Sequence, residues 1–192
     1  SNPLINSSTP LNHGLVAWYP FDGNASDMSG NGNHGTVNGA TLGTDRQGVV
    51  GKAYSFDGVD DWIDLNKKLL EENFSLCFWA KIETSHQIQS GEQGLAFYST
   101  YVSGLGGFVA FYLPSNGGYL NFRFHDGSNS TNLNFGGNDS SADFTKWNKI
   151  FLSKNENASL FLNSKLVQSV DVNSFLSPSS FTAGGSNNGE SI

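Results

Sequence analysis

The sequence predicts an all-β fold, an antiparallel two-sheet jelly-roll sandwich, and three observations support this prediction. Short stretches alternate between apolar and polar residues, as half-buried strands do. Turn signals separate these stretches, and the 23 glycines are scattered along the chain instead of forming a repeat. A helical period is almost absent, since the one helical candidate is the short segment 67–73, KKLLEEN.

Length and composition are those of one domain with a real core. The chain has 192 residues, of which 37% are hydrophobic and 13% aromatic, and a β-sandwich often reaches this size. Residues 1–12 carry two prolines and no clear pattern, so we expect a tail or linker there and the domain in residues 13–192. Because the chain starts Ser-Asn-Pro, we expect it to be a fragment of a larger protein.

The expected strands follow one another with loops between them. Gly14–Phe21 is apolar on both faces, so we expect this strand in the centre of a sheet, covered on both sides. Pro178 removes a donor from residues 175–181, which we expect to be an extended connection. Further strands are expected within 53–65 and at 74–82, 95–99, 107–113, 119–125, 147–152 and 158–163, with loops at 22–35, 86–94 and 128–143.

The stretch 53–65, AYSFDGVDDWIDL, is an alternating strand that turns at Asp57-Gly58 and continues into a second strand. Asp57, Asp60 and Asp61 place three carboxylates within five residues, and such charges need hydrogen-bond donors or a cation. Two interpretations are open. The carboxylates either cap their own backbone at a solvated hairpin tip or form a calcium-binding corner.

Three segments carry a family resemblance. FDGVDDWIDL resembles the signature hairpin of bacterial laminin G-like domains, members of the concanavalin A-like jelly-roll group. GLVAWYPFDGNASDMSGNGNHG at 14–35 is similar to the opening strand and loop of that family, and 145–164 to a later hairpin. The resemblance implies a structural calcium held by Asp22, Asp57 and Asp60.

The resemblance also implies one further strand, of the form Gly-x-Ile-Asp-Asp-Val-x-Ile-Tyr, after the segment AGGSNNGE at 183–190. The sequence ends at Ile192 without it, so the expected fold lacks the final family strand. Three explanations are open: the strand is missing from this sequence, the N-terminal tail fills its place, or a strand donor comes from another chain.

Charge excludes several partners. The formal net charge is −7 and the isoelectric point is about 4.8, without a basic stripe, so nucleic acid and an anionic membrane surface are not expected. No apolar run reaches the length of a membrane span, and no signal peptide is recognisable. The single Cys77 excludes an internal disulfide and is expected to be a small buried residue. The composition favours a secreted or cell-surface protein.

Catalysis is not expected. Laminarinase-type relatives of the fold use a Glu-x-Asp-x-x-Glu strand, and none of the glutamates here lies in that pattern. Alginate-lyase-like jelly rolls need a cluster of Gln, His, Arg and Tyr. Residues 86–89 with Tyr119 and Arg123 supply these residue types, but without the strand motifs of that family. Zinc spacing of His and Cys is absent from the sequence.

Carbohydrate binding needs aromatic rings with a polar handle, flanked by planar polar groups. The best candidates lie on polar strand positions or loops: Tyr98, Tyr101, Tyr119, Arg123, His125 and Asp126. The tryptophans Trp18, Trp62, Trp79 and Trp147 are expected to be structural, because each lies inside a strand pattern. The sequence therefore predicts a noncatalytic carbohydrate-binding module of a larger extracellular bacterial protein. An adhesion or spacer domain that contacts protein is the alternative, and a polysaccharide-degrading enzyme is the third choice.

Overall fold

The computed structural model of the chain describes residues 14–57, 60–65, 73–81, 95–99, 107–113, 119–125, 130–136 and 143–171. In the four strands between 95 and 136 it describes the backbone, together with the side chains of Phe122 and Leu133. The expectations for the tail 1–12, most of the segment 67–73, the loop 86–94, the connection 175–181 and the chain end lie outside the described residues.

All regular elements in the described ranges are β-strands, and every strand pair is antiparallel. The all-β antiparallel prediction is therefore confirmed. None of the described residues forms a helix long and apolar enough to cross a membrane. The strands are β1 (Thr36–Asn38), β2 (Thr41–Thr44), β3 (Val50–Ser55), β4 (Trp62–Asp64), β5 (Phe74–Ala80), β6 (Leu95–Ser99), β7 (Gly107–Leu113), β8 (Tyr119–His125), β9 (Ser130–Gly136), β10 (Asn148–Lys154), β11 (Asn157–Leu162) and β12 (Lys165–Asp171).

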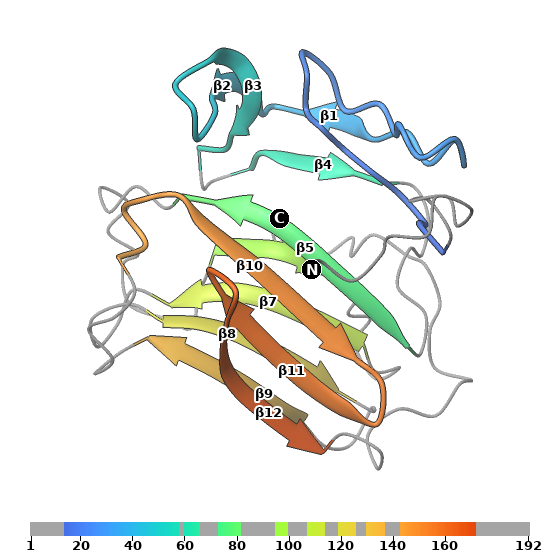
Figure 1. Cartoon of the computed structure of the whole chain (residues 1–192). Coiled ribbons are helices and arrows are strands. Elements are labelled where there is room, and N and C mark those ends of the chain that lie inside the picture. The colour runs from blue at the N-terminus through green and yellow to red at the C-terminus, as the bar shows by residue number, and fades with distance from the viewer. Residues whose placement is uncertain are drawn as a thin grey trace, which may run out of the picture.

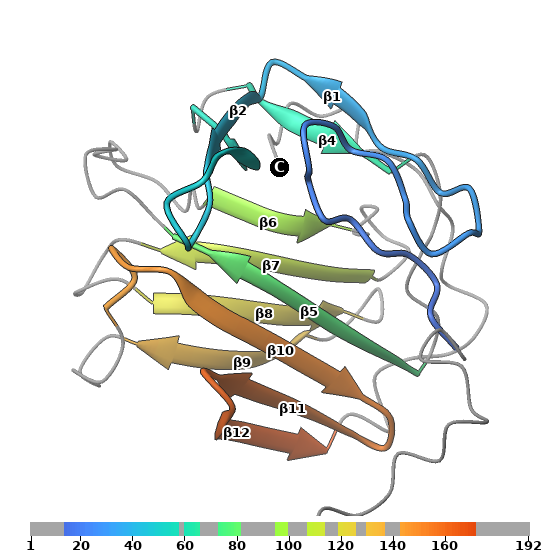
Figure 2. The same ribbon diagram turned by 45° about the horizontal axis from the view of Figure 1, so that its top comes forward.

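Two four-stranded sheets make up most of the described structure, with the strand orders β12-β11-β10-β5 and β6-β7-β8-β9. Figures 1 and 2 show the first sheet lying across the second, and β9 contacts both β11 and β12. The pairs β1-β4 and β2-β3 form two small sheets beside them. The strand β5 is thus paired with β10, far from it in the sequence, so the sheet joins the two halves of the chain.

The hairpin of β10 and β11 supplies the clearest part of the core. Side chains alternate strictly along both strands, and Ile150, Leu152 and Leu160 are at most 1% exposed. Register places Ile150 opposite Leu162 and Leu152 opposite Leu160, so the buried side chains form cross-strand pairs. We call this the inner face of the sheet, and the opposite face the outer face.

The outer face carries side chains that the sequence placed elsewhere. Cys77 in β5 is exposed, so the prediction of a buried cysteine is wrong. Its strand alternates, and Cys77 pairs in register with Phe151 on the outer side of β10. Trp79, in the same strand, is 43% exposed, and Trp62, in the separate sheet of β1 and β4, is 40% exposed. A tryptophan inside a strand pattern can thus lie on the face that packs little.

The predicted strand Gly14–Phe21 is not a strand in the structure, and it is not covered on both sides. Trp18 is 55% exposed and Val16 is 46% exposed. The physical reason is that side chains of the following loop form hydrogen bonds with backbone carbonyls of this segment, which a neighbouring strand would otherwise bind. The side-chain amide of Asn33 donates a hydrogen bond to the backbone carbonyl of Val16 at 2.9 Å. The side-chain amide of Asn31 donates one to the backbone carbonyl of Leu15 at 2.7 Å.

Four strands lie where the sequence predicted a loop or gave no assignment: β1, β2, β9 and β12. The segment 128–143 was expected to be a loop, but residues 130–136 form β9, whose Leu133 is fully buried. Leu133 and Phe135 are two residues apart, so the strand signal was present within a polar stretch. β12 follows the hairpin turn at Asn163-Ser164 and contains a bulge beside β11.

Candidate functional site

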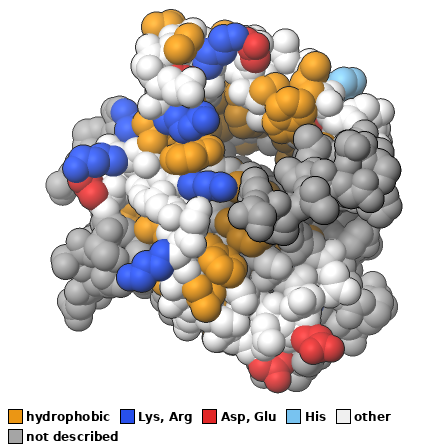
Figure 3. All heavy atoms as spheres, in the orientation of Figure 1, with side chains coloured by type: hydrophobic (Ala, Val, Ile, Leu, Met, Phe, Trp, Pro, Cys, Tyr) orange, Lys and Arg blue, Asp and Glu red, His pale blue; other side chains and the backbone are white. Residues whose placement is uncertain are grey.

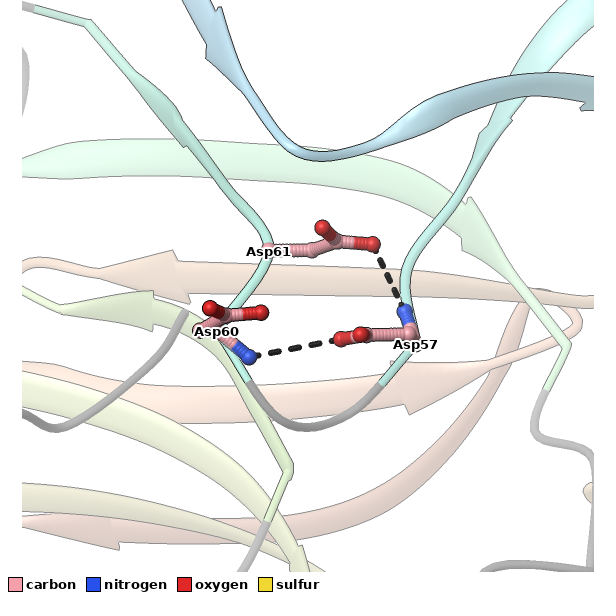
Figure 4. A group of neighbouring side chains, drawn as sticks. All are labelled: Asp57, Asp60 and Asp61. Atoms are coloured by element: carbon pink, nitrogen blue, oxygen red, sulfur yellow. Dashed lines mark hydrogen bonds between the residues drawn. The ribbon is translucent and has the colours of Figure 1, made fainter.

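Three carboxylates meet at the turn between β3 and β4, as Figure 4 shows. One oxygen from each of Asp57, Asp60 and Asp61 lies within 4.8 Å of the others. The amide of Asp57 donates to the Asp61 carboxylate at 2.8 Å, and the amide of Asp60 donates to the Asp57 carboxylate at 3.3 Å. The carboxylates of Asp57 and Asp61 therefore cap the backbone of their own turn, and the three clustered carboxylates also have the chemistry that calcium prefers.

This turn is held close to the loop between β1 and β2. Gly39 there has a φ of +77°, and a Cβ at this position would collide with the carboxylate of Asp61. Glycine is thus required twice, for its backbone conformation and for the close approach of Asp61.

Asp22, the third predicted calcium ligand, has a different neighbour. Its carboxylate forms an ion pair with the ammonium of Lys52 in β3, and it is not a member of the group formed by Asp57, Asp60 and Asp61. Asp61 stands in that group instead, and the sequence signal for it was the adjacent pair Asp60-Asp61. The calcium assignment stays a prediction.

The loop 22–35 is organised by Asp27, which is only 5% exposed. Its carboxylate accepts hydrogen bonds from the amides of Trp18, Ser29 and Asn33 and from the Ser29 hydroxyl, at 2.8 to 3.0 Å. Burial alone would raise the pKa of Asp27, but these hydrogen bonds outweigh it and hold the pKa well below its usual range. Asn24 also bonds within this loop, because its side-chain oxygen accepts from the Ser26 amide at 2.8 Å.

Of the residues predicted to bind carbohydrate, three lie on β8. Tyr119, Arg123 and His125 occupy alternate positions, so they belong to one face of the strand, opposite to that of the buried Phe122. Tyr98 in β6 pairs with Ala110, which pairs with Phe122, so the register places Tyr98 in the row of Phe122. The structure therefore separates Tyr98 from the other three by face. Tyr101 and Asp126 lie outside the described residues.

The register reveals polar partners for this face of β8 that the sequence reading missed. On β9, Asn134 lies opposite Asn121, Asn132 opposite Arg123, and Ser130 opposite His125. These cross-strand pairs form a ladder of polar residues along two neighbouring strands. We call the six positions the β8–β9 polar ladder: Asn121, Arg123, His125, Ser130, Asn132 and Asn134. They were missed because the segment 128–143 was expected to be a loop.

The described antiparallel sheets define an all-β domain. The chain belongs to the family described as Clostridium neurotoxin, N-terminal receptor binding, whose sequence profile matches residues 22–180. This is a family of noncatalytic receptor-binding domains with a concanavalin A-like jelly-roll fold. At the level of the jelly-roll group, the sequence-based resemblance agrees with this result, whereas membership of the laminin G-like family is not shown.

Solved structures support the fold. The crystal structure of the botulinum neurotoxin serotype D binding domain matches with a TM-score of 0.65 at 19% sequence identity, covering 84% of this chain and 40% of that chain. The chain thus spans less than half the length of that binding domain. An S-layer domain-containing protein (residues 221–444) from Clostridium thermocellum matches with a TM-score of 0.45 at 21% identity, covering 80% of this chain and 71% of that chain, a similarity too low to support an inference. No curated protein matched the chain.

Proposed function

We propose that the chain is a noncatalytic module that recognises a carbohydrate receptor as part of a larger secreted or cell-surface protein. The observation that carries this proposal is the match to a receptor-binding family over residues 22–180. The name of that family refers to a receptor, and we infer a glycan as the recognised group by analogy with other proteins of the lectin-like fold.

Within this proposal the two four-stranded sheets are the layers of a jelly-roll sandwich. The contact of β9 with β11 and β12 supports it, because it brings the two sheets together at one margin. Buried side chains on both sheets support it as well, Phe122 and Leu133 on one and Ile150 and Leu152 on the other. Such a sandwich leaves the opposite face of each sheet for ligands.

The β8–β9 polar ladder is the proposed glycan site. Amide and guanidinium groups are planar and offer several donors and acceptors in fixed directions, which is what a sugar hydroxyl pair requires. Arg123 opposite Asn132 and Asn121 opposite Asn134 give two such pairs in consecutive rungs. Tyr119 at the start of the strand adds an aromatic position to the same face.

A glycan array, run with and without calcium, tests the function. We expect a defined set of glycans to bind, and binding to be lost in the Arg123→Ala and Asn132→Ala variants while their melting temperatures stay close to the wild type. Lys146→Ala, at an exposed residue in the turn before β10, is the matched control. An array without a single bound glycan would favour the alternative, an adhesion or spacer domain that contacts protein.

A further inference from the structure

The outer face of the sheet β12-β11-β10-β5 is patterned in rows that run across the strands. One row consists of serines alone, one from each strand, paired in register from β5 to β12: Ser75, Ser153, Ser159 and Ser169. The hydroxyls of Ser159 and Ser169 lie 2.8 Å apart and share a hydrogen bond. We call this set the hydroxyl row.

The next row on the same face is apolar. It also takes one residue from each strand, and we call it the carbon row: Cys77, Phe151, Phe161 and Leu166. Cys77 is exposed, and Leu166 is 53% exposed. The rings of Phe151 and Phe161 lie with centroids 5.5 Å apart and planes inclined by 58°, so the row is a ridged strip of carbon surface.

Positive charge borders the carbon row on the side away from the serines. Lys149 pairs in register with Trp79, and the guanidinium of Arg46 lies 4.8 Å from the Trp79 ring centroid. The turn that carries Arg46 is fixed by Asp45, whose carboxylate accepts from the amides of Gln47 at 2.9 Å and Val49 at 2.8 Å. We call Arg46 and Lys149 the cation border.

The cation border has no acidic partner among the described residues. Within the described part of the chain neither Arg46 nor Lys149 forms an ion pair, and neither row contains an acidic side chain. Figure 3 shows Lys and Arg side chains beside hydrophobic ones on this face. The positive charge at this margin of the face contrasts with a net charge of −7 for the whole chain, so it favours an anionic group there.

We propose that the outer face of this sheet binds a linear acidic polysaccharide that runs across the strands. The sugar C–H groups lie on the carbon row, hydroxyls exchange hydrogen bonds with the hydroxyl row, and carboxylates point to Arg46 and Lys149. This site is separate from the polar ladder on β8 and β9 and does not depend on the function proposed for it.

The regular spacing favours a polymer over a folded partner. Neighbouring strands lie about 4.8 Å apart, so each row repeats the same chemistry at that interval over roughly 14 Å. A linear polysaccharide presents the same groups at regular intervals, so it can contact each step of the rows. A second copy docked face to face offers no acidic side chain from either row to the cation border.

The test uses polygalacturonate, the same polymer with methyl-esterified carboxylates, and poly-L-glutamate, each titrated calorimetrically into the chain. We expect polygalacturonate to bind and its affinity to fall with added salt, and the ester and poly-L-glutamate to bind far more weakly. Lys149→Glu should weaken binding about tenfold or more, because an attraction becomes a repulsion. Lys146→Glu makes the same change in charge at a turn outside the rows and should have little effect.

Leu166→Glu is a second variant, at an exposed position of the carbon row, and keeps the test valid if Lys149→Glu does not fold. Equal binding by poly-L-glutamate would mean that charge alone is recognised and would overturn the proposal. So would failure of polygalacturonate to bind, or an equal loss in the Lys149 and Lys146 variants. Loss of polygalacturonate binding in Arg123→Ala, with Lys149→Glu unaffected, would move the polymer to the polar ladder and also reject the outer face.

Discussion

The phenol of Tyr19 donates a hydrogen bond of 2.5 Å to the backbone carbonyl of Asn33, fourteen residues further along the chain. Asn33 is thus bonded at its carbonyl by Tyr19 and at its amide by Asp27, which ties the loop 22–35 to the segment before it. The Tyr19 ring stacks on Phe21, which in turn meets Tyr54 of β3 edge to face. The extended segment that the sequence suggested as a strand is thus anchored by side chains to the loop and to a small sheet.

Replacing Tyr19 by Phe should alter the alkaline stability of the protein. Burial, followed by the charge of nearby Asp27, raises the pKa of Tyr19 to about 12. The folded state favours the neutral phenol, so this contribution is complete below about pH 10 and is lost as the pH rises toward the folded value. In Tyr19→Phe we expect a loss of about 1 kcal/mol at neutral pH and a weaker fall in stability above pH 10, measured by urea unfolding. An unchanged alkaline profile would contradict this account.

Asp27→Asn should destabilise the protein at neutral pH by about 2 kcal/mol. The side-chain nitrogen of the new asparagine would face N–H and O–H groups that now donate hydrogen bonds to the carboxylate. The pKa of Asp27 is lowered in the folded state. Its contribution is therefore present above the unfolded pKa of about 4 and is lost as the pH falls below it. Denaturant melts between pH 7 and pH 2 should show a shallower acid dependence in the variant. Asp22→Asn, which breaks only the exposed pair with Lys52, is the control and should cost at most about 1 kcal/mol.

Ser164→Gly should stabilise the protein. The turn between β11 and β12 has Asn163 at a φ of 48° and Ser164 at 71°, both in the left-handed region. A side chain there costs about 1 kcal/mol relative to glycine, and a two-residue hairpin turn with both φ values positive favours Asn-Gly. A higher melting temperature by calorimetry is expected. Asn163→Gly should not show this gain, because the Asn163 side chain bonds to the Lys149 amide and to Asn148, both at 2.9 Å.

If calcium binds at Asp57, Asp60 and Asp61, it should stabilise the native state by roughly 3 kcal/mol at a hundredfold excess over its dissociation constant. Thermal melts with calcium and with a chelator measure this. We expect Asp60→Asn combined with Asp61→Asn to abolish the shift, and Asp22→Asn to leave it intact, since Asp22 pairs with Lys52. Identical melting curves of the wild type with calcium and with chelator would reject calcium binding at this turn.

The sequence predicted the fold class and the β10–β11 hairpin because alternation there is strict and every second side chain is buried. It failed at 14–21 because a hydrophobic pattern does not reveal that Asn31 and Asn33 will take the backbone carbonyls of this segment. The acidic turn was found because its three carboxylates are neighbours in the sequence.

The surfaces proposed as binding sites could be predicted only in part. The β8 half of the polar ladder was recognised from its alternation, but the β9 half depends on a register that places Asn132 opposite Arg123. The hydroxyl row joins serines from four strands spread over residues 75–169. Pairing between distant strands is set by tertiary packing, so no local pattern could have brought these residues together.

The exposure of Cys77 has a practical consequence. It is the only cysteine in the sequence, and it lies on the carbon row opposite Phe151. A thiol-reactive fluorophore would therefore attach at one position, in the middle of the outer face, without an engineered residue. Because the thiol is accessible, air oxidation of the purified protein should yield dimers linked by a Cys77–Cys77 disulfide. Reducing agents should cleave this bond and return the monomer.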